Sequence, residues 1–250
     1  KFIIDSLVYW VKEYHIDGFR FDLMGLIDKE TMREIDKILH EINSSILIYG
    51  EPWYALPPSL DSSKQIYKGV QKGMDIAVFN DNYRNAIKGD NDTDKKGYVS
   101  GAPSLDQQIK KGVVGGVHYN SKINDFTSSP EETVNYVSSH DNLTLWDKFK
   151  LSNTEDSEKI RIKMDRMAQA VIFTSQGIPL IQGGEEFLRT KYRNANSFNA
   201  GDKVNQLKWH RKSKYHDTFK YYQGLIKLRK EHPAFRIGDS DKIRESIGFY

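Results

Sequence analysis

Residues 2–23, FIIDSLVYWVKEYHIDGFRFDL, decide the fold class because two hydrophobic periods follow each other within them. Apolar side chains first recur at helical spacing, at positions Phe2, Ile3, Leu7, Trp10 and Val11. Residues 19–23 then alternate between apolar and polar as a strand does. We therefore predict helix, turn and strand as the first unit of the chain.

The same succession of helix and strand continues along the sequence. Asp28 is a candidate N-cap for a helix that ends near Ile42, and a short apolar run follows at residues 46–49. Further apolar runs lie at residues 74–79, 134–137 and 178–181. Helical stretches separate them, near residues 81–88, 157–173 and 215–230. Five short buried strands interleaved with helices indicate an α/β protein with a parallel sheet.

Polar or small residues follow every predicted strand. They are Asp22, Glu51, Asn80 with Asp81, His140 with Asp141, and residues 183–186. In a (β/α)8 barrel the carboxyl ends of the strands converge on the active site, whereas a doubly wound sheet binds ligands at a switch point. The recurrence favours an incomplete (β/α)8 TIM barrel. Residues 54–72 and 90–131 are too long for tight connections, so we expect loops over the barrel mouth.

Composition excludes several kinds of function. The 250 residues include 37 basic and 34 acidic ones, a net charge of +3 that argues against nucleic-acid and membrane-surface partners. The absence of cysteine excludes disulfides and thiolate sites. No apolar run approaches the roughly 20 residues of a membrane-spanning helix, and the histidines form no zinc pattern, so we expect no metal site. Because the chain opens inside a helix pattern, we expect it to be a fragment.

Two of the strand-end acids fit glycoside hydrolysis, which needs a nucleophilic carboxylate and a protonated one. Asp22 lies two residues after Arg20, on the same face of the strand, where a guanidinium would keep it ionised. Glu51 has aromatic and apolar neighbours in sequence, which would raise its pKa and suit a general acid and base. A third acid, Asp141, would stabilise an oxocarbenium-like transition state.

Each acid taken alone has a simpler explanation. Asp22 and Arg20 could equally form a buried ion pair with a structural role only. Glu51 could equally be an acid that stabilises a helix N-terminus, and Asp141 could equally be the cap of a turn. Spacing and composition therefore do not establish a glycosidase.

Longer strings of sequence resemble a known family. Residues 17–25 (DGFRFDLMG), 49–53 (YGEPW) and 136–148 (YVSSHDNLTLWDK) look like three of the four signature regions of the α-amylase superfamily, glycoside hydrolase family 13. Within that superfamily they resemble type I pullulanases. Further similarity lies at residues 76–81 (IAVFND), 184–191 (GEEFLRTK), 196–199 (NSFN) and 204–207 (VNQL), so the resemblance extends over essentially the whole chain.

The resemblance implies roles for individual residues. Asp22 would be the nucleophile, Glu51 the general acid and base, and Asp141 the transition-state stabiliser. The implied substrate contacts are Arg20, Trp53, His140, Asn142, Asn199 and Asp202. Trp53 would stack on the leaving glucan, with a core tryptophan as the alternative. For the last two contacts a polar loop turn is at least as well supported.

The implied activity is hydrolysis, with retention, of α-1,6 branch linkages in pullulan, amylopectin or limit dextrins. One alternative is an α-1,4-acting amylase, a neopullulanase or an isoamylase-like debranching enzyme, and another is a non-catalytic glucan-binding subunit. No cofactor is required. A structural calcium is common among relatives, and residues 90–94 offer oxygen ligands, although a solvated turn is favoured there. The resemblance implies a bacterial parent, and the sequence does not separate a secreted enzyme from a cytoplasmic one.

The sequence also departs from the family's pattern. The first signature region and three barrel strands would lie upstream, so residues 1–238 would hold strands 4 to 8 of the barrel. Residues 239–250 would begin a carboxyl-terminal β-sandwich, with a strand at residues 242–250. Glu185 stands where related sequences often have glutamine, and Phe198 where they often have tyrosine. We expect the chain alone to be inactive, because the rest of the polypeptide must complete the barrel.

Overall fold

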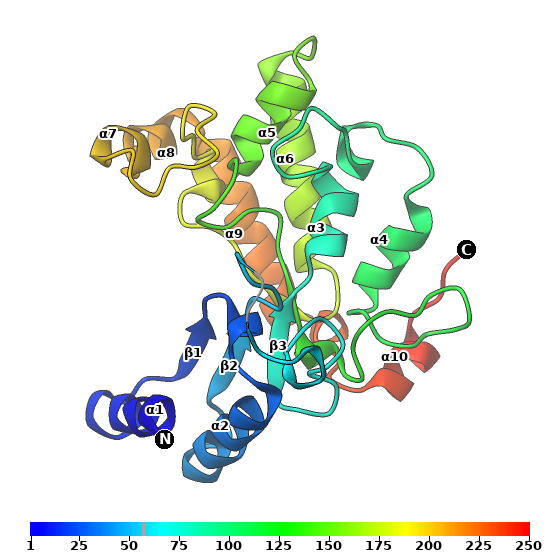
Figure 1. Ribbon diagram of the computed structural model, residues 1–250. Helices are drawn as coiled ribbons and strands as arrows, with labels where there is room; N and C mark the ends of the chain where they lie inside the picture. The colour runs from blue at the N-terminus through cyan, green and yellow to red at the C-terminus, as the bar shows by residue number, and fades with distance from the viewer. Residues whose placement is uncertain (57–58) are drawn as a thin grey trace.

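The computed structural model describes residues 1–56 and 59–250, and five parallel strands form its sheet (Figure 1). Each strand pairs with its neighbours along the chain, in the order β1-β2-β3-β4-β5. The strands are Gly18–Phe21 (β1), Leu47–Gly50 (β2), Ile76–Phe79 (β3), Thr133–Asn135 (β4) and Ile178–Pro179 (β5). A parallel sheet in chain order, with helices in its connections, fits part of a TIM barrel. The predicted α/β class and the five predicted strands are confirmed.

Helices precede and follow the strands. They are Phe2–Tyr14 (α1), Lys29–Ile42 (α2), Asp81–Lys88 (α3), Asp106–Val113 (α4), Leu145–Ser152 (α5), Glu158–Phe173 (α6), Asp202–Asn205 (α7), His210–Lys214 (α8), His216–Glu231 (α9) and Ser240–Ser246 (α10). In Figure 1, α1 and α2 lie beside β1 and β2 in the lower part of the molecule, while α5 to α8 lie in the upper part and α9 runs down from there toward the sheet. No helix among the described residues combines the length and the apolar composition that a bilayer crossing requires.

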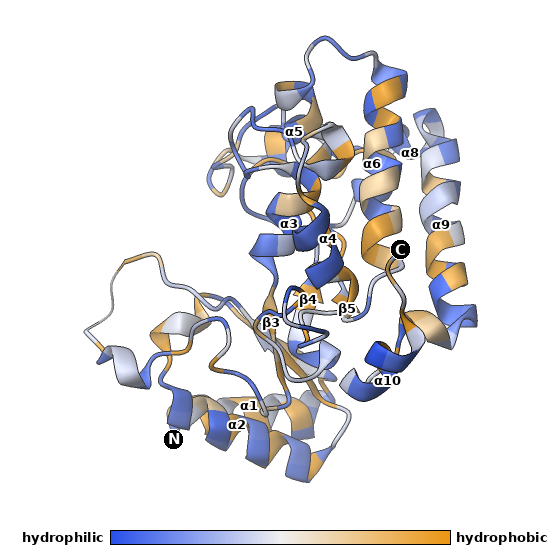
Figure 2. Ribbon diagram, turned by 90° about the vertical axis from the view of Figure 1, so that its right-hand side faces the viewer, coloured by the Kyte–Doolittle hydropathy of each residue, from blue (hydrophilic) through white to orange (hydrophobic). Residues whose placement is uncertain are grey.

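One hydrophobic core joins α2 to the first three strands. Asp28 caps α2 as predicted, since its carboxylate accepts a hydrogen bond from the Thr31 amide at 2.9 Å. The apolar face of this helix then packs on the sheet through Met32, Ile35 and Leu39, each almost fully buried. Figure 2 shows the division of α2 into an apolar and a polar face. Burial of each such side chain contributes about 1.5–3 kcal/mol, which fixes the position of β1 and β2.

A second core lies between the later helices. It contains Tyr83 of α3, Phe149 of α5 and Ile172 of α6. The Tyr222 hydroxyl of α9 donates a hydrogen bond of 2.7 Å to the buried Asp165 carboxylate of α6. This core supports the segments that follow β3 and β4.

Two segments differ from their predicted structure. Residues 106–113, within the predicted loop at 90–131, form α4, because Ile109 packs into the second core and Gly112 leaves room for the Tyr83 ring. The strand predicted at residues 242–250 is wrong. Residues 240–246 form α10, which Asp239 caps and whose Ile243 is fully buried. The other predicted long loop, at residues 54–72, includes residues 57 and 58, which lie outside the described residues.

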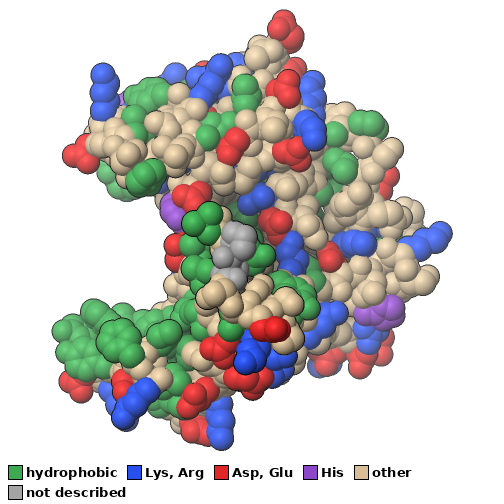
Figure 3. Space-filling model, in the orientation of Figure 1, with side chains coloured by type: hydrophobic (Ala, Val, Ile, Leu, Met, Phe, Trp, Pro, Cys, Tyr) green, Lys and Arg blue, Asp and Glu red, His purple; other side chains and the backbone are tan. Residues whose placement is uncertain are grey.

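The helix that precedes the first strand exposes a group of apolar side chains. Tyr9, Trp10 and Tyr14 of α1 pack against one another by their rings, yet each is at least 43% exposed, and Phe2 is 85% exposed. Figure 3 shows hydrophobic side chains gathered over this part of the molecule, at the lower left. Exposed apolar groups of this extent are typical of surfaces that bind a partner, whether a protein, a ligand or a membrane.

Candidate active site

Three of the predicted site residues lie where parallel strands end. Asp22 follows β1 directly, Glu51 follows β2 directly, and Asp141 lies in the segment after β4. The register pairs Phe21 with Gly50, and the Glu51 amide donates to the Phe21 carbonyl at 3.0 Å. Asp22 and Glu51 are therefore held on adjacent strand ends by the backbone pairing itself.

The guanidinium of Arg20 joins these two acids. One of its nitrogens contacts the Asp22 carboxylate and the other contacts the Glu51 carboxylate. The second oxygen of Glu51 accepts a hydrogen bond of 2.8 Å from the Leu23 amide. The side chain of Glu51 is 7% exposed and that of Asp22 is 64% exposed, so the first acid is enclosed and the second faces solvent.

This arrangement agrees with one expectation and not with another. The predicted contact between Arg20 and Asp22 is confirmed. The expected apolar surroundings of Glu51 are wrong, because its carboxylate has a guanidinium and a backbone amide as partners. The sequence neighbours of Glu51 could not reveal this, since both partners come from the β1 segment.

A cavity of about 320 Å³ opens beside the acids. It is lined by Glu51, Trp53, Asp81, Arg84, Asn91, Tyr136, Ser139, Asp141 and Asn142. Figure 3 shows the molecule hollowed between its lower and upper parts, with acidic and histidine side chains on the inner wall. Two of the three predicted catalytic acids thus line one cavity, and Arg20 connects the third, Asp22, to it.

Arg84 was not anticipated from the sequence. Its guanidinium donates a hydrogen bond of 2.6 Å to the Tyr136 hydroxyl and lies over the same ring, 5.3 Å from the centroid. Burial raises the pKa of Tyr136 to about 12, which keeps the hydroxyl neutral. Arg84 lies three residues after Asp81 on α3, and that helical spacing, which puts both on one face, was the available signal.

Asp141 and its neighbours form an exposed turn. His140 Nε2 lies 3.6 Å from an Asp141 carboxylate oxygen, and both side chains are at least 60% exposed. Asn142 adopts a left-handed conformation with φ of 61°. Its side-chain oxygen accepts from Asn91 at 2.7 Å, and its nitrogen donates to Asp92 at 2.6 Å. The amide of Asn142 therefore anchors this turn to residues 91–92.

The remaining predicted substrate contacts differ in position. Trp53 lines the cavity and is half-buried, and its ring, 6.2 Å from that of Phe79, also packs against the buried cluster around Phe79. Its carbonyl accepts a hydrogen bond of 3.1 Å from the Gly25 amide. Asn199 and Asp202 are exposed and do not line this cavity. The structure thus brings Trp53 to the acids but leaves Asn199 and Asp202 apart from them.

Donors of the protein itself engage the oxygens that residues 92–95 could offer to a calcium ion. Both carboxylate oxygens of Asp92 accept hydrogen bonds, from Asn142 at 2.6 Å and from the Leu143 amide at 2.9 Å. The Lys148 ammonium donates to the carbonyls of Thr93 and Lys95, each at 2.6 Å. A protein cation thus occupies the point where carbonyl oxygens gather, and this donor set does not fit calcium.

Asp36, His40 and Asp75 are the one group of three potential metal ligands found within residues 1–56 and 59–250. Both ring nitrogens of His40 already have partners, the Asp36 carboxylate at 2.7 Å and the Ile46 carbonyl at 2.8 Å. Burial disfavours the charged ring, but these two acceptors outweigh it and raise the pKa of His40. Because Ile46 precedes β2, the group lies at the amino ends of the strands, away from the acids.

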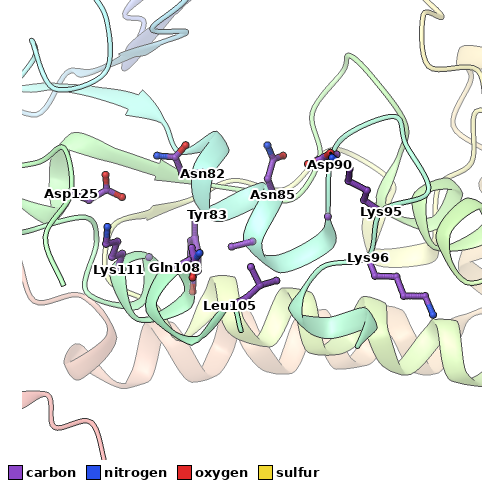
Figure 4. A pocket seen from close by; sticks show the side chains of 13 residues that line it. Asn82, Tyr83, Asn85, Asp90, Lys95, Lys96, Leu105, Gln108, Lys111 and Asp125 are labelled. Carbon is purple, nitrogen blue, oxygen red and sulfur yellow. The ribbon is translucent and has the colours of Figure 1, made fainter. Parts of the chain in front are cut away.

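A second cavity, of about 380 Å³, lies between α3 and α4 (Figure 4). Its wall carries Asn82 and Asn85 from α3, with Lys111 of α4 and Asp125 across from them. Burial raises the pKa of Asp125, and Lys111 partly offsets this effect. This cavity and the one at the strand ends share no lining residue in the described part of the chain. Glu51 and Asp141 line only the cavity at the strand ends.

Two curated pullulanases align with this chain over nearly all of its length. No family model matches the sequence. A pullulanase of Bacillus subtilis (strain 168) is 35% identical over 248 residues, which are 99% of this chain and 34% of the relative. A pullulanase of Klebsiella pneumoniae is 26% identical, across 100% of this chain and 29% of the relative. The chain therefore spans about a third of the length of these curated relatives.

Solved structures of pullulanases are also similar to this chain over about a third of their length. Pullulanase from Bacillus acidopullulyticus superimposes with a TM-score of 0.94 at 52% identity, over 98% of this chain and 30% of that structure. Pullulanase from Paenibacillus barengoltzii, solved in complex with maltohexaose and α-cyclodextrin, gives a TM-score of 0.94 at 44% identity, over 98% of this chain and 38% of that structure. In sequence and in fold, the chain is homologous to pullulanases over its whole length.

Proposed function

We propose that this chain carries the catalytic carboxylates of a retaining glycoside hydrolase that cleaves α-1,6 linkages in α-glucans. Asp22 is the nucleophile, Glu51 the general acid and base, and Asp141 the stabiliser of the transition state. The observation that carries this proposal is the guanidinium of Arg20 in contact with both Asp22 and Glu51. Retaining glycosidases hold their two carboxyl groups about 5–5.5 Å apart, and a shared guanidinium keeps two carboxylates at short range.

The first chemical step forms a covalent intermediate. The Asp22 carboxylate attacks the anomeric carbon, the bond from that carbon to the glycosidic oxygen breaks, and Glu51 gives its proton to the departing oxygen. Asp22 suits this role because its carboxylate contacts the Arg20 guanidinium and its side chain is exposed. In an α-1,6 linkage the departing oxygen is the 6-hydroxyl of a glucose unit in the main chain.

The second step releases the sugar with its original anomeric configuration. Glu51, now a carboxylate, takes a proton from water as that water attacks the anomeric carbon, and the ester bond to Asp22 breaks. Positive charge develops on the sugar ring in both transition states, and Asp141 stabilises it across the cavity. The reaction is balanced by these side chains and water, so we propose that no cofactor takes part.

The substrate is proposed to be an α-glucan. The cavity offers an aromatic ring, Trp53, for the apolar face of a pyranose, and charged and amide groups for its hydroxyls, among them Arg84 and Asn91. The homologous Paenibacillus enzyme was solved with maltohexaose, which is an α-glucan. His140 and Arg20 are proposed as further contacts, to the sugar and to the nucleophile. Asn199 and Asp202 are retained only as weaker proposed contacts, since both are exposed and neither lines the cavity.

We further propose that the chain works as part of a longer polypeptide. Residues 1–238 would supply strands 4 to 8 of the barrel, and residues 239–250 the approach to a carboxyl-terminal domain. The exposed aromatic side chains of α1 and the similarity to about a third of each pullulanase support this. The remaining polypeptide would cover α1 and provide the other barrel strands.

The linkage specificity is tested by product analysis. The complete polypeptide that contains this chain is incubated with pullulan, and the products are separated by size. Maltotriose as the product supports cleavage of α-1,6 bonds. Panose or mixed maltodextrins would assign the chain to an α-1,4-acting relative, and glucan binding without hydrolysis would assign it to a non-catalytic subunit.

A further inference from the structure

The turn that carries Asp141 is held by three side chains from other parts of the chain. The Ser138 hydroxyl contacts the buried Glu185 carboxylate. The Leu143 amide donates to Asp92 at 2.9 Å. The His140 carbonyl, on the peptide bond to Asp141, accepts a hydrogen bond of 2.9 Å from the Lys191 ammonium. Of the three contacts, that of Lys191 acts on the backbone of Asp141 most directly.

Lys191 is itself fixed at both of its ends. Its backbone amide donates to one carboxylate oxygen of Asp147 at 2.7 Å, and the Thr190 hydroxyl donates to the other oxygen at 2.5 Å. Asp147 is fully buried within α5, and Lys191 is 1% exposed. A continuous set of contacts therefore runs from the second core, through Asp147 and Lys191, to the peptide bond of Asp141.

A buried ammonium needs an explanation, because an apolar side chain of similar size would avoid the cost of desolvating the charge. Burial lowers the pKa of Lys191, and nearby carboxylates, Asp141 first among them, act in the opposite direction. Within the described residues, no carboxylate oxygen lies within 4.0 Å of the ammonium to form an ion pair with it. Its hydrogen-bond acceptor is instead the His140 carbonyl, so this buried side chain donates where it supports the turn.

We propose that Lys191 is a positioning residue for Asp141: anchored on Asp147, it holds the His140 carbonyl and thereby sets the place of the Asp141 carboxylate in the cavity. This inference rests on the proposed function of Asp141. Because that acid acts on the transition state, its displacement lowers kcat more than it weakens substrate binding. A general loss of folding would instead lower the amount of active enzyme and the Tm.

The test compares variants of the complete polypeptide on pullulan, assayed well below the Tm of each. Lys191→Met removes the hydrogen bond at similar volume, and we expect kcat to fall about 10- to 100-fold with KM within about twofold of wild type. Lys191→Arg keeps a donor cation and should recover part of kcat. Asp147→Asn leaves the lysine in place but weakens its anchor, so it should lower kcat less than Lys191→Met does. If Lys191→Met does not fold, the kcat of Asp147→Asn tests the inference instead.

Arg229→Met is the matched control. Arg229 is also a buried cation that donates to backbone carbonyls, those of Phe173, Ser175 and Gly177, but at the amino end of β5. Its loss should lower the Tm and leave kcat unchanged. A kcat for Lys191→Met equal to that of wild type would overturn the inference. If only Asp147→Asn folds, an unchanged kcat in that variant would overturn it. An equal fall in kcat for Arg229→Met would also overturn it. Absence of hydrolysis by the wild type would instead overturn the proposed function.

Discussion

The guanidinium of Arg20 contacts the carboxylate of Glu51, a residue 31 positions later in the sequence and on the neighbouring strand end. Both residues are placed by the parallel pairing of β1 and β2, in which Arg20 lies opposite Tyr49. The same guanidinium contacts Asp22, so one cation orients two acids of different exposure. The pairing of two short strands is therefore the structural basis of the proposed catalytic pair.

Replacement of Arg20 tests this relationship. We expect Arg20→Met in the complete polypeptide to lower kcat/KM on pullulan by about 100-fold or more, because both carboxylates lose their shared partner. Arg20→Lys retains the charge but not the two-pronged geometry, so it should recover only a small part. The measurement is the initial rate of reducing-sugar release. Activity of Arg20→Met within threefold of wild type would show that the bridge is not needed.

The close approach of Gly25 to Trp53 gives a second prediction. A Cβ atom at Gly25 would lie 2.6 Å from the Trp53 carbonyl oxygen, which accepts the Gly25 amide hydrogen bond. We expect Gly25→Ala to displace the segment that carries Glu51 and Trp53, with a cost of about 1–3 kcal/mol in stability and a marked loss of kcat.

Gly224 provides the matched control for that substitution. A Cβ atom there, within α9, meets nothing within 4 Å. Gly224→Ala should therefore stabilise the helix by up to about 1 kcal/mol and leave kcat unchanged. Thermal unfolding and pullulan kinetics on both variants check the pair. Equal behaviour of the two alanine variants would contradict the proposed packing of Gly25.

The buried carboxyl of Glu185 should make the stability of the folded protein depend on pH. It is 2% exposed, and burial raises the pKa of its carboxyl from 4.5 to about 7. Between these values the folded protein holds a proton that the unfolded chain has lost, so this group's contribution to stability falls as pH rises from about 4.5 to 7. Glu185→Gln removes the titration. Relative to wild type, the variant should gain about 3 kcal/mol between pH 4.5 and pH 7.5.

Urea denaturation at several pH values measures this difference. Wild type and Glu185→Gln are compared in the same buffers, at pH values below, between and above the two pKa values. Parallel stability curves for the two proteins would contradict the assignment of a raised pKa to the buried Glu185.

Arg84 is expected to bind substrate rather than to act in the chemical step. Arg84→Met should raise KM for pullulan about tenfold, equivalent to about 1.4 kcal/mol, with kcat little changed, because a cavity-wall donor is lost. Arg166 is the control, since it also lies over a tyrosine ring and donates to a hydroxyl, that of Thr218 at 3.0 Å, outside the cavity. An unchanged KM in Arg84→Met, or an equal rise in Arg166→Met, would refute this role.

Local patterns were enough to predict much of the fold. The apolar runs gave the strands, and Asp28 with its helix followed from capping chemistry. The acids at strand ends could be placed together because parallel strands share one direction. What the sequence could not predict depends on contacts between distant segments. The helical form of residues 240–246 depends on burial of Ile243 in a cluster with Val114 and Val117, far away in sequence.

The site shows the same division. The contact of Arg20 with Asp22 is local, two residues apart on one strand, and it was predicted correctly. The partners of Glu51 and the role of Arg84 toward Tyr136 arise only from the packing of separate elements. Asn199 and Asp202 were chosen by resemblance alone, and neither lies on the wall of the cavity.

The most direct test of the proposed chemistry is the rate of pullulan hydrolysis by the complete polypeptide and by its Asp22→Asn and Asp28→Asn variants. Asp28→Asn makes the same chemical change at the cap of α2, outside the cavity, and should retain wild-type kcat. Asp22→Asn removes the nucleophile, and we predict a loss of at least about a thousandfold. Asp22→Asn activity within tenfold of an active wild type would contradict the assignment of Asp22 as the nucleophile.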